Sequence, residues 1–246
     1  MADLHIHSTL SPCGSLEMSP KKIVERAKMR EINLISVTDH NAIKNSEPAK
    51  NLAEKHGISY IYGMEVQTEE EVHILTYFDN YSELLNVWNI IYEKLPNIEN
   101  KADYFGDQVI LDEDENILGF EKKLLLNSSK ISLEELCKIV QENNGIAIPA
   151  HIDSSSFNIL SQIGIIPEHL FFPFLEISYA YDKNDIISKY PFLKNRRFVS
   201  FSDAHYLNDI GRACTLFEIE APSVNEIKLS ANSVSERKTK ITRRIK

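Results

Sequence analysis

Cysteine is scarce in this chain, and the three residues present have no informative spacing. Cys13, Cys137 and Cys214 form neither a zinc-knuckle spacing nor an even set for disulfide bonds. Cys137 falls in the apolar phase of a predicted helix, which is typical of a small core side chain. The sequence therefore offers neither a disulfide framework nor a cysteine-based zinc module.

The chain also lacks a long hydrophobic run. No stretch approaches the roughly 18 uninterrupted apolar residues of a transmembrane helix. The start at Met1-Ala2-Asp3 leaves no room for a signal peptide before the first predicted strand. We therefore expect no membrane partner and a cytoplasmic location. With 246 residues, of which 43% are hydrophobic and 26% charged, the composition is that of a globular protein.

Positive charge is in deficit, with 27 Lys and Arg against 36 Asp and Glu and a net charge of −9. This balance opposes non-specific binding to a phosphate backbone. The exception is a basic C-terminal tail over about residues 235–246. No aromatic residues alternate with its charges, as a single-strand binding surface would need. We interpret the tail as a solvated terminus, with a nucleic-acid contact as the less favoured alternative.

Apolar runs and helical patterns alternate along most of the chain. The predicted strands cover residues 2–7, 33–38, 58–66, 71–78, 146–150, 174–178, 198–202 and 215–219. The predicted helices cover residues 20–30, 47–56, 81–95 and 133–143. Alternating strands and helices favour a parallel sheet or barrel, and we expect one domain over residues 1–246.

One segment, about residues 104–122, interrupts this alternation. Two short apolar runs, 108–111 and 117–120, flank the acidic turn Asp112-Glu113-Asp114-Glu115-Asn116. This pattern predicts an inserted β-hairpin. The hairpin either covers the mouth of a site or makes a subunit contact, and the sequence leaves the oligomeric state open.

A histidine pair opens the chain. Side chains alternate across a strand, so His5 and His7 point to one face. Two neutral imidazoles side by side pack poorly in an apolar core, but they can supply half of the ligands of a metal site. Further candidates follow at the ends of apolar runs, where α/β folds place their chemistry: His40, Glu65, His73, His151, Asp203 and His205. Histidine and carboxylate without a cysteine cluster suit Zn, Mn or Fe in a catalytic site.

These motifs, in order, resemble the PHP superfamily, the polymerase and histidinol phosphatase metallohydrolases. The resemblance runs from Asp3 to about Arg212 and includes Thr38-Asp39-His40 and Asp203-x-His205. It implies an α/β fold, a distorted (β/α)7 TIM-like barrel, with two or three divalent metal ions at the C-terminal ends of the strands. It also implies hydrolysis of phosphate esters.

The same resemblance implies how the candidate ligands divide among the metals. The first metal would be held by His5, His7, Glu65 and Asp203. Glu65 would bridge to a second metal, held by His73 and His151. His40 and His205 resemble ligands of a third, at which the family usually adds a histidine where this chain has Cys13. A thiolate can bind Zn or Fe, and the alternative is a weaker or absent third ion.

Three further roles concern residues beside these ligands. His205 or His40 would supply the proton that the leaving alkoxide needs. Arg212 would grip a phosphate bidentately, with a surface salt bridge as an equally favoured alternative. Asp39 and Asp3 are interpreted as groups that orient metal-bound histidines.

We therefore expect a phosphoesterase that hydrolyses a small phosphate monoester or nucleotide through a metal-bound hydroxide, with no covalent intermediate. The first alternative is a 3′-5′ exonuclease or oligonucleotide phosphodiesterase, because polymerase-fused members of the family cleave DNA ends. A non-catalytic metal-stabilised module and an amidohydrolase are less favoured. The substrate itself is not specified by the sequence.

Overall fold

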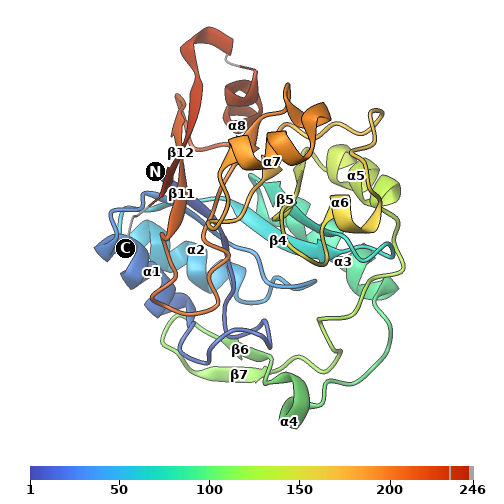
Figure 1. The fold of residues 1–246 in the computed structure, drawn as a ribbon. Coiled ribbons are helices and arrows are strands. Elements are labelled where there is room, and N and C mark those ends of the chain that lie inside the picture. The colour runs from blue at the N-terminus through green and yellow to red at the C-terminus, as the bar shows by residue number, and fades with distance from the viewer. Residues whose placement is uncertain (233, 244–246) are drawn as a thin grey trace.

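The strands form four hydrogen-bonded sheets in the computed structural model, which describes residues 1–232 and 234–243 (Figure 1). The sheet orders are β12-β11-β1-β2-β3, β4-β5-β8, β10-β9 and β6-β7. The strands are β1 (Ala2–Ile6), β2 (Leu34–Val37), β3 (Ser59–Tyr60), β4 (Tyr62–Gln67), β5 (His73–Phe78), β6 (Val109–Leu111), β7 (Ile117–Phe120), β8 (Ile146–Pro149), β9 (Leu175–Glu176), β10 (Phe198–Val199), β11 (Ala213–Glu218) and β12 (Lys238–Arg243). The fold is a mixed α/β fold, which confirms the predicted class.

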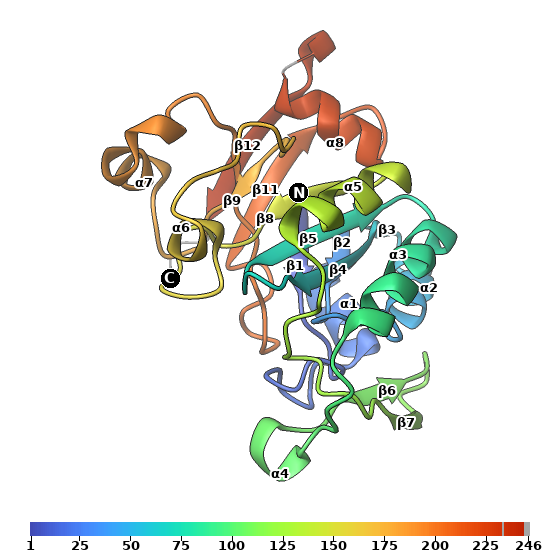
Figure 2. The same ribbon diagram turned by 90° about the vertical axis from the view of Figure 1, so that its right-hand side faces the viewer.

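Serine caps begin two of the predicted helices. Ser19 accepts from the backbone N–H of Lys22 and begins α1, and Ser132 caps α5 in the same way. The helices are α1 (Pro20–Met29), α2 (Ser46–Lys55), α3 (Tyr81–Lys94), α4 (Ala102–Phe105), α5 (Leu133–Glu142), α6 (Ile159–Gln162), α7 (Lys183–Lys189) and α8 (Val224–Ala231), with short 3-10 turns η1 (Pro191–Leu193) and η2 (Val234–Glu236). Helices α2, α3 and α5 pack against β2–β5 and β8 (Figure 2).

The expectation of a parallel arrangement is wrong at β5 and at β11, which runs antiparallel to both β1 and β12. β1, β2 and β3 are parallel, but β5 runs antiparallel to both β4 and β8. The predicted strand 58–66 is also divided at Ile61 into β3 and β4, which join different sheets. Only residues 68–72 connect β4 to β5. A link this short joins antiparallel neighbours, because a parallel pair needs a crossover of a dozen or more residues.

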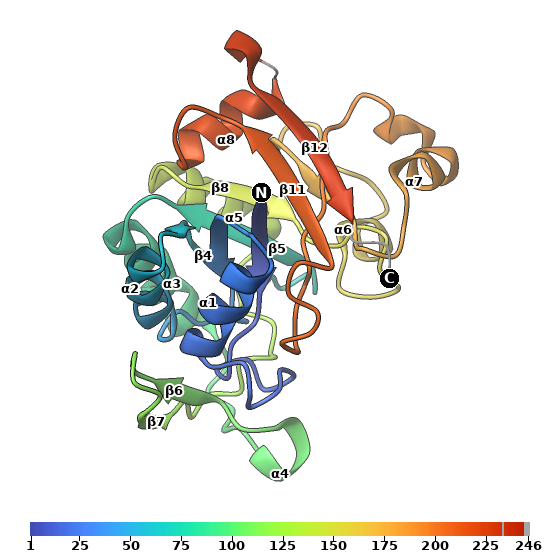
Figure 3. The same cartoon turned by 90° about the vertical axis from the view of Figure 1, so that its left-hand side faces the viewer.

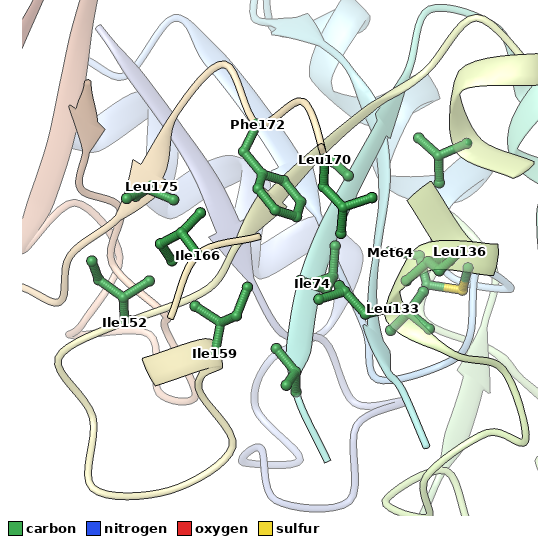
Figure 4. Close-up of a cluster of buried hydrophobic side chains, with 14 of the residues drawn as sticks. Met64, Ile74, Leu133, Leu136, Ile152, Ile159, Ile166, Leu170, Phe172 and Leu175 are labelled. Atoms are coloured by element: carbon green, nitrogen blue, oxygen red, sulfur yellow. The ribbon is translucent and has the colours of Figure 1, made fainter. Parts of the chain in front are cut away.

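Alternation along β4 separates the apolar core from the polar face. Met64 and Val66 are buried in a cluster with Ile74 of β5 and Leu136 of α5, as Figure 4 shows for Met64, Ile74 and Leu136. Glu65, between them, points to the opposite face. The packed core therefore fixes the strand that presents this carboxylate.

Two peripheral segments test further predictions. The hairpin is present, since β6 and β7 pair antiparallel, and the Asp112 carboxylate accepts the N–H groups of Asp114 and Asn116 in its turn. The interpretation of the tail as a solvated terminus is wrong for residues 238–243. This segment forms β12, paired with β11 over six residue pairs (Figure 3), because β11 offers it a free strand edge. Residues 244–246 lie outside the described residues.

Across the described ranges, no helix combines the length and the apolarity that crossing a membrane requires.

Candidate metal centre

The two histidines of the opening motif meet at the end of β1. Their Nε2 atoms lie 3.2 Å apart, and both side chains are buried. The Nδ1 atom of His5 lies 3.0 Å from a Glu176 carboxylate oxygen, and Nδ1 of His7 lies 3.0 Å from the Ser11 hydroxyl. The Ser11 hydroxyl in turn donates to Asp39. Because Nδ1 is occupied in each ring, the Nε2 lone pairs face each other across the site.

Glu65 is the centre of the cluster. Its carboxylate is 1% exposed and lies within 3.4 Å of five imidazoles. The nearest distances from its oxygens are 3.4 Å to His5, 3.4 Å to His7, 2.9 Å to His40, 3.1 Å to His73 and 3.3 Å to His151. So many nitrogens around one carboxylate form a set of metal ligands rather than a single ion pair.

Asp203 completes a group of four donors. Its Oδ1 atom lies 3.4 Å from Nε2 of both His5 and His7. The distances that join the two imidazoles to each other, to Glu65 and to Asp203 therefore run from 3.2 to 3.4 Å. A tetrahedron with metal–ligand bonds of about 2.1 Å has an edge of about 3.4 Å. The two imidazoles and a carboxylate oxygen from either acid are thus spaced like ligands of one Zn-sized ion.

A second group lies on the other side of Glu65. Nε2 of His73 lies 3.1 Å from the Gln67 amide oxygen, and the ring of Phe157 stacks on the imidazole at 5.0 Å. Nδ1 of His151 is buried without a hydrogen-bond partner among the described residues. Nδ1 of His73 and Oε2 of Glu65 are also buried, and their contacts with Glu65 Oε1 and His40 Nδ1 at 3.1 and 2.9 Å lack hydrogen-bond geometry. Such orphaned polar atoms are costly in a folded protein. A bound cation between them would account for at least the His73 and Glu65 atoms.

The third group consists of His40, His205 and Cys13. Ligand atoms of His7, His40 and His205 lie within 4.8 Å of one another, and so do those of His40, Glu65 and His73. The Cys13 thiol lies against the other two members of its group. Burial acts to raise the pKa of Cys13, but the imidazoles of His40 and His205 lower it to about 6. The structure thus brings together every predicted ligand, with His40 shared between two donor groups.

The charges of Glu65 and His7 suit metal binding. Burial acts to raise the pKa of Glu65, yet His73, His5 and His40 hold it well below its usual range. Burial, followed by the neighbouring His205 and His40, holds the pKa of His7 well below its usual range. Glu65 is therefore an anion, and His7 is a neutral imidazole with a free lone pair. Burial acts to lower the pKa of His5 and of His40, but their anionic neighbours hold both well above the usual range, so a metal would displace protons from these two rings.

Strained backbone marks the ligand positions. His151, Asp203 and Asn41, which follows His40, have φ values of 27°, 47° and 49°. This left-handed region is unfavourable for residues other than glycine, and it persists where the surrounding structure demands it. At His151 the constraint is a hydrogen bond, because the backbone N–H donates to the Glu176 carboxylate.

Arg212 has its donors occupied by the protein. Its guanidinium donates to the backbone carbonyls of Ser202 and Asp203 at 2.7 and 3.1 Å and stacks over the Tyr179 ring at 3.8 Å. It also lies 3.3 Å from the Asp209 carboxylate, the salt bridge expected as the alternative. Asp3 supports the same segment, since it accepts the N–H of Ser202. Both residues therefore hold the loop that carries Asp203.

Sequence reasoning missed Glu176, which bonds both His5 and the backbone of His151. It lies inside the apolar run from Phe174 to Ile177 and is 1% exposed. A carboxylate in the buried phase of a short strand is the signal that could have identified it. Gln67, Ser11 and Phe157 carried no comparable signal.

The clustered side chains open to the surface through a pocket of about 450 Å³. We call it the histidine pocket. Its lining includes His40, Glu65, His73, His151, Asp203 and His205, together with Cys13 and Phe157. The described residues that line it include no lysine or arginine. An anionic substrate would therefore depend on bound cations for its charge neutralisation.

Residues 3–159, more than half of the chain, match the family model of the PHP domain. The chain belongs to this family, as the motifs implied.

Among similar proteins, an uncharacterised protein from Methanocaldococcus jannaschii is 35% identical over 78 residues, which cover 28% of this chain and 45% of that protein. A 5′-3′ exoribonuclease from Haemophilus influenzae is 38% identical over 76 residues, covering 30% of this chain and 27% of that protein. The matches thus span less than half of these relatives.

The fold is similar to that of the lesion-specific endonuclease EndoQ from Pyrococcus furiosus. The TM-score is 0.72 at 21% identity, and the alignment covers 97% of this chain and 57% of that chain.

Proposed function

We propose that the protein is a divalent-metal-dependent phosphodiesterase that cleaves single-stranded nucleic acid in the histidine pocket. The observation that carries the proposal is the contact of Glu65 with five imidazoles inside 3.4 Å. Zn, Mn or Fe ions bound there would neutralise charge on the phosphoryl oxygens and lower the pKa of an attacking water.

The donor geometry supports a division into three metal-binding groups. His5, His7, Glu65 and Asp203 would hold the first ion. Glu65 would be shared with His73 and His151, whose Nδ1 and Nε2 atoms lie 3.1 and 3.3 Å from it. His40, His205 and Cys13 would hold a third, with the thiol in the place of an imidazole.

The remaining roles belong to the protein's own side chains. His205 lines the pocket and is less buried than the other histidine ligands, with 24% of its side chain exposed. Where the third ion is not bound, the His205 ring is placed to give a proton to the leaving oxygen, and His40 is the second candidate. Arg212 would act by positioning Asp203 and by placing its charge beside the pocket.

Two observations favour a nucleic-acid strand over a small monoester. Aromatic rings flank the pocket, since Phe157 lines it and exposed Tyr179 and Tyr206 directly follow the lining residues Ser178 and His205. Such rings stack on bases of any sequence. The similar proteins also include an exoribonuclease and a DNA endonuclease.

A second candidate, hydrolysis of a small phosphate monoester or nucleotide, is favoured by the net charge of −9. Excess negative charge repels a long phosphate backbone unless cations are gathered locally.

We further propose that one domain contains a distorted barrel of β1, β2, β4, β5, β8, β9 and β10. Backbone hydrogen bonds support three joints between these strands. They include those from Asn41 to Glu65, from Ile152 to Glu176 and from His7 to Ala204.

A substrate comparison with the purified protein tests the function. With Mn²⁺ present, a labelled single-stranded oligonucleotide should be shortened, while mononucleotides and p-nitrophenyl phosphate should be hydrolysed far more slowly. Hydrolysis of the monoesters with an intact oligonucleotide would select the second candidate.

A further inference from the structure

A second cleft, of about 540 Å³, lies between the region of α7 and η1 and the strand β12. Figure 3 shows α7 beyond β12, away from the hairpin β6-β7. Five cationic residues line the cleft, and we call it the basic cleft: Lys183, Lys194, Arg196, Arg197 and Lys240. Phe174, Ile177 and Phe198 contribute apolar surface to it.

No ion pair ties these cations to the fold. Within residues 1–232 and 234–243, no acidic side chain forms an ion pair with any of the five. Asp182 is the acidic residue in the lining, and its carboxylate accepts the N–H of Asn184 as the cap of α7. A chain with nine more acids than bases thus gathers five cations without acidic partners around one cleft.

The cleft has the chemistry of a phosphate-binding site. Arginine and lysine bind phosphate oxygens through charge-assisted hydrogen bonds, and arginine does so bidentately. The apolar floor offers a surface for a base or a sugar beside the charged rim. The histidine pocket shows the opposite pattern, because its described lining residues include no lysine or arginine.

A short segment connects the two sites. Ile177 lines the basic cleft, and the next residue, Ser178, lines the histidine pocket. The chain then passes exposed Tyr179 and Tyr181 and returns to the basic cleft at Lys183. The five residue-to-residue steps from Ser178 to Lys183 span at most about 18 Å. A strand that followed this segment from the pocket would pass Tyr179, whose ring stacks with Arg212, then exposed Tyr181, and then the cations. Single-strand-binding surfaces use this combination of aromatic and cationic side chains.

We propose that the basic cleft binds the phosphate backbone of the single-stranded nucleic acid whose phosphodiester is held in the histidine pocket. The inference rests on the proposed function, because it assigns a path to that substrate. The cleft supplies affinity through charge, and the pocket supplies the reaction.

The experiment compares two pairs of charge reversals that change the net charge equally. Lys194→Glu with Arg197→Glu removes cations from the cleft. Lys22→Glu with Lys138→Glu, on the exposed faces of α1 and α5, is the control. Binding of a fluorescein-labelled single-stranded oligothymidylate is measured by anisotropy in chelator, where no cleavage is needed. KM is measured separately for the oligothymidylate and for a thymidine dinucleotide.

We expect the cleft pair to weaken binding at least about tenfold and to reduce the salt slope by about 0.7 for each lost phosphate contact. KM should rise for the oligothymidylate and stay constant for the dinucleotide. The milder pair Lys194→Gln with Arg197→Gln should show the same direction, which guards against a folding defect.

Equal effects of the two charge-reversal pairs, or no effect of the cleft pair, would overturn the proposal. The proposal would also be overturned if the cleft bound a nucleoside triphosphate but no oligothymidylate, because it would then be a small-ligand site. Because anisotropy does not require turnover, a protein that binds the strand through the cleft without cleaving it would refute the proposed reaction while supporting the cleft.

Discussion

The histidine pocket and the basic cleft differ in how their side chains are held. In the pocket, His5, His7 and Glu65 are almost fully buried, and each ring is fixed by an outer partner. In the cleft, the cations are exposed or half-buried and have no ion pair among the described residues. Metal binding in the pocket depends on single atoms in fixed positions, and phosphate binding in the cleft depends on the sum of charges. Substitutions in the two sites should therefore have different effects.

The largest effect is expected at the centre of the pocket. Glu65→Gln keeps the size of the side chain but removes the anion that five imidazoles surround, so we expect loss of most bound metal and a lower Tm in metal-containing buffer. Elemental analysis and thermal unfolding measure both quantities. Glu69→Gln, at an exposed position on the loop that follows β4, is the matched control. Normal metal content in Glu65→Gln would show that Glu65 is not a ligand.

Glu176→Gln tests whether the outer partners matter in the pocket. The amide can no longer stabilise His5 through a charged hydrogen bond, and loss of such a partner typically costs about 10–100-fold in metal affinity or activity. Titration of the metal-free protein with Zn²⁺ or Mn²⁺ measures the change. Glu168→Gln, in an exposed loop, should leave affinity unchanged. An unchanged metal affinity in Glu176→Gln would show that Glu176 contributes only to packing and not to metal binding.

The sequence was sufficient for the parts of the pocket that follow from strand geometry. A period of two places His5 and His7 on one face, and the structure has their Nε2 atoms 3.2 Å apart. It was insufficient for strand direction, since the residues of β5 read the same in either orientation. The loop length between β4 and β5 was the available signal.

The basic cleft could not be predicted in this way. Its cations come from positions 183, 194, 196, 197 and 240, and no spacing relates them. Lys240 enters only because β12 pairs with β11, a contact that the tail's composition does not reveal. A buried motif with regular spacing can therefore be predicted from the sequence, whereas a charge cluster built from separate segments cannot.

Cys13→Ala examines the exposed edge of the pocket. If the thiolate serves as a ligand with His40 and His205, the variant should lose about one metal equivalent, because a site with one donor fewer binds more weakly. Elemental analysis against the parent measures this. Cys214→Ala, at a buried position in β11, should keep the full content. Unchanged metal content and activity in Cys13→Ala would leave two metal sites and a bystander thiol.

The smallest effect is expected from a buried carboxylate outside both sites. Glu121 accepts from Lys44 and Tyr92. Burial acts to raise its pKa, but these partners lower it below the ordinary 4.5. A lowered pKa means that its stabilisation is present above pH 4.5 and is lost as the pH falls through the folded-state value. Glu121→Gln should cost about 1 kcal/mol of unfolding free energy at neutral pH.

Denaturant unfolding at several pH values checks this, and the curves of parent and variant should converge in acid. Turnover should not change. A loss of activity in Glu121→Gln would contradict this prediction, because it would show that Glu121 does more than stabilise the fold.

The central claim is tested most directly by cleavage of a single-stranded oligonucleotide before and after metal exchange. The protein is treated with chelator, assayed, and assayed again after Mn²⁺ is returned, with Glu65→Gln treated in parallel. We expect the parent to lose and regain activity and the variant to show none at any stage. Full activity in the chelated parent, or in Glu65→Gln, would contradict a metal-dependent reaction centred on Glu65.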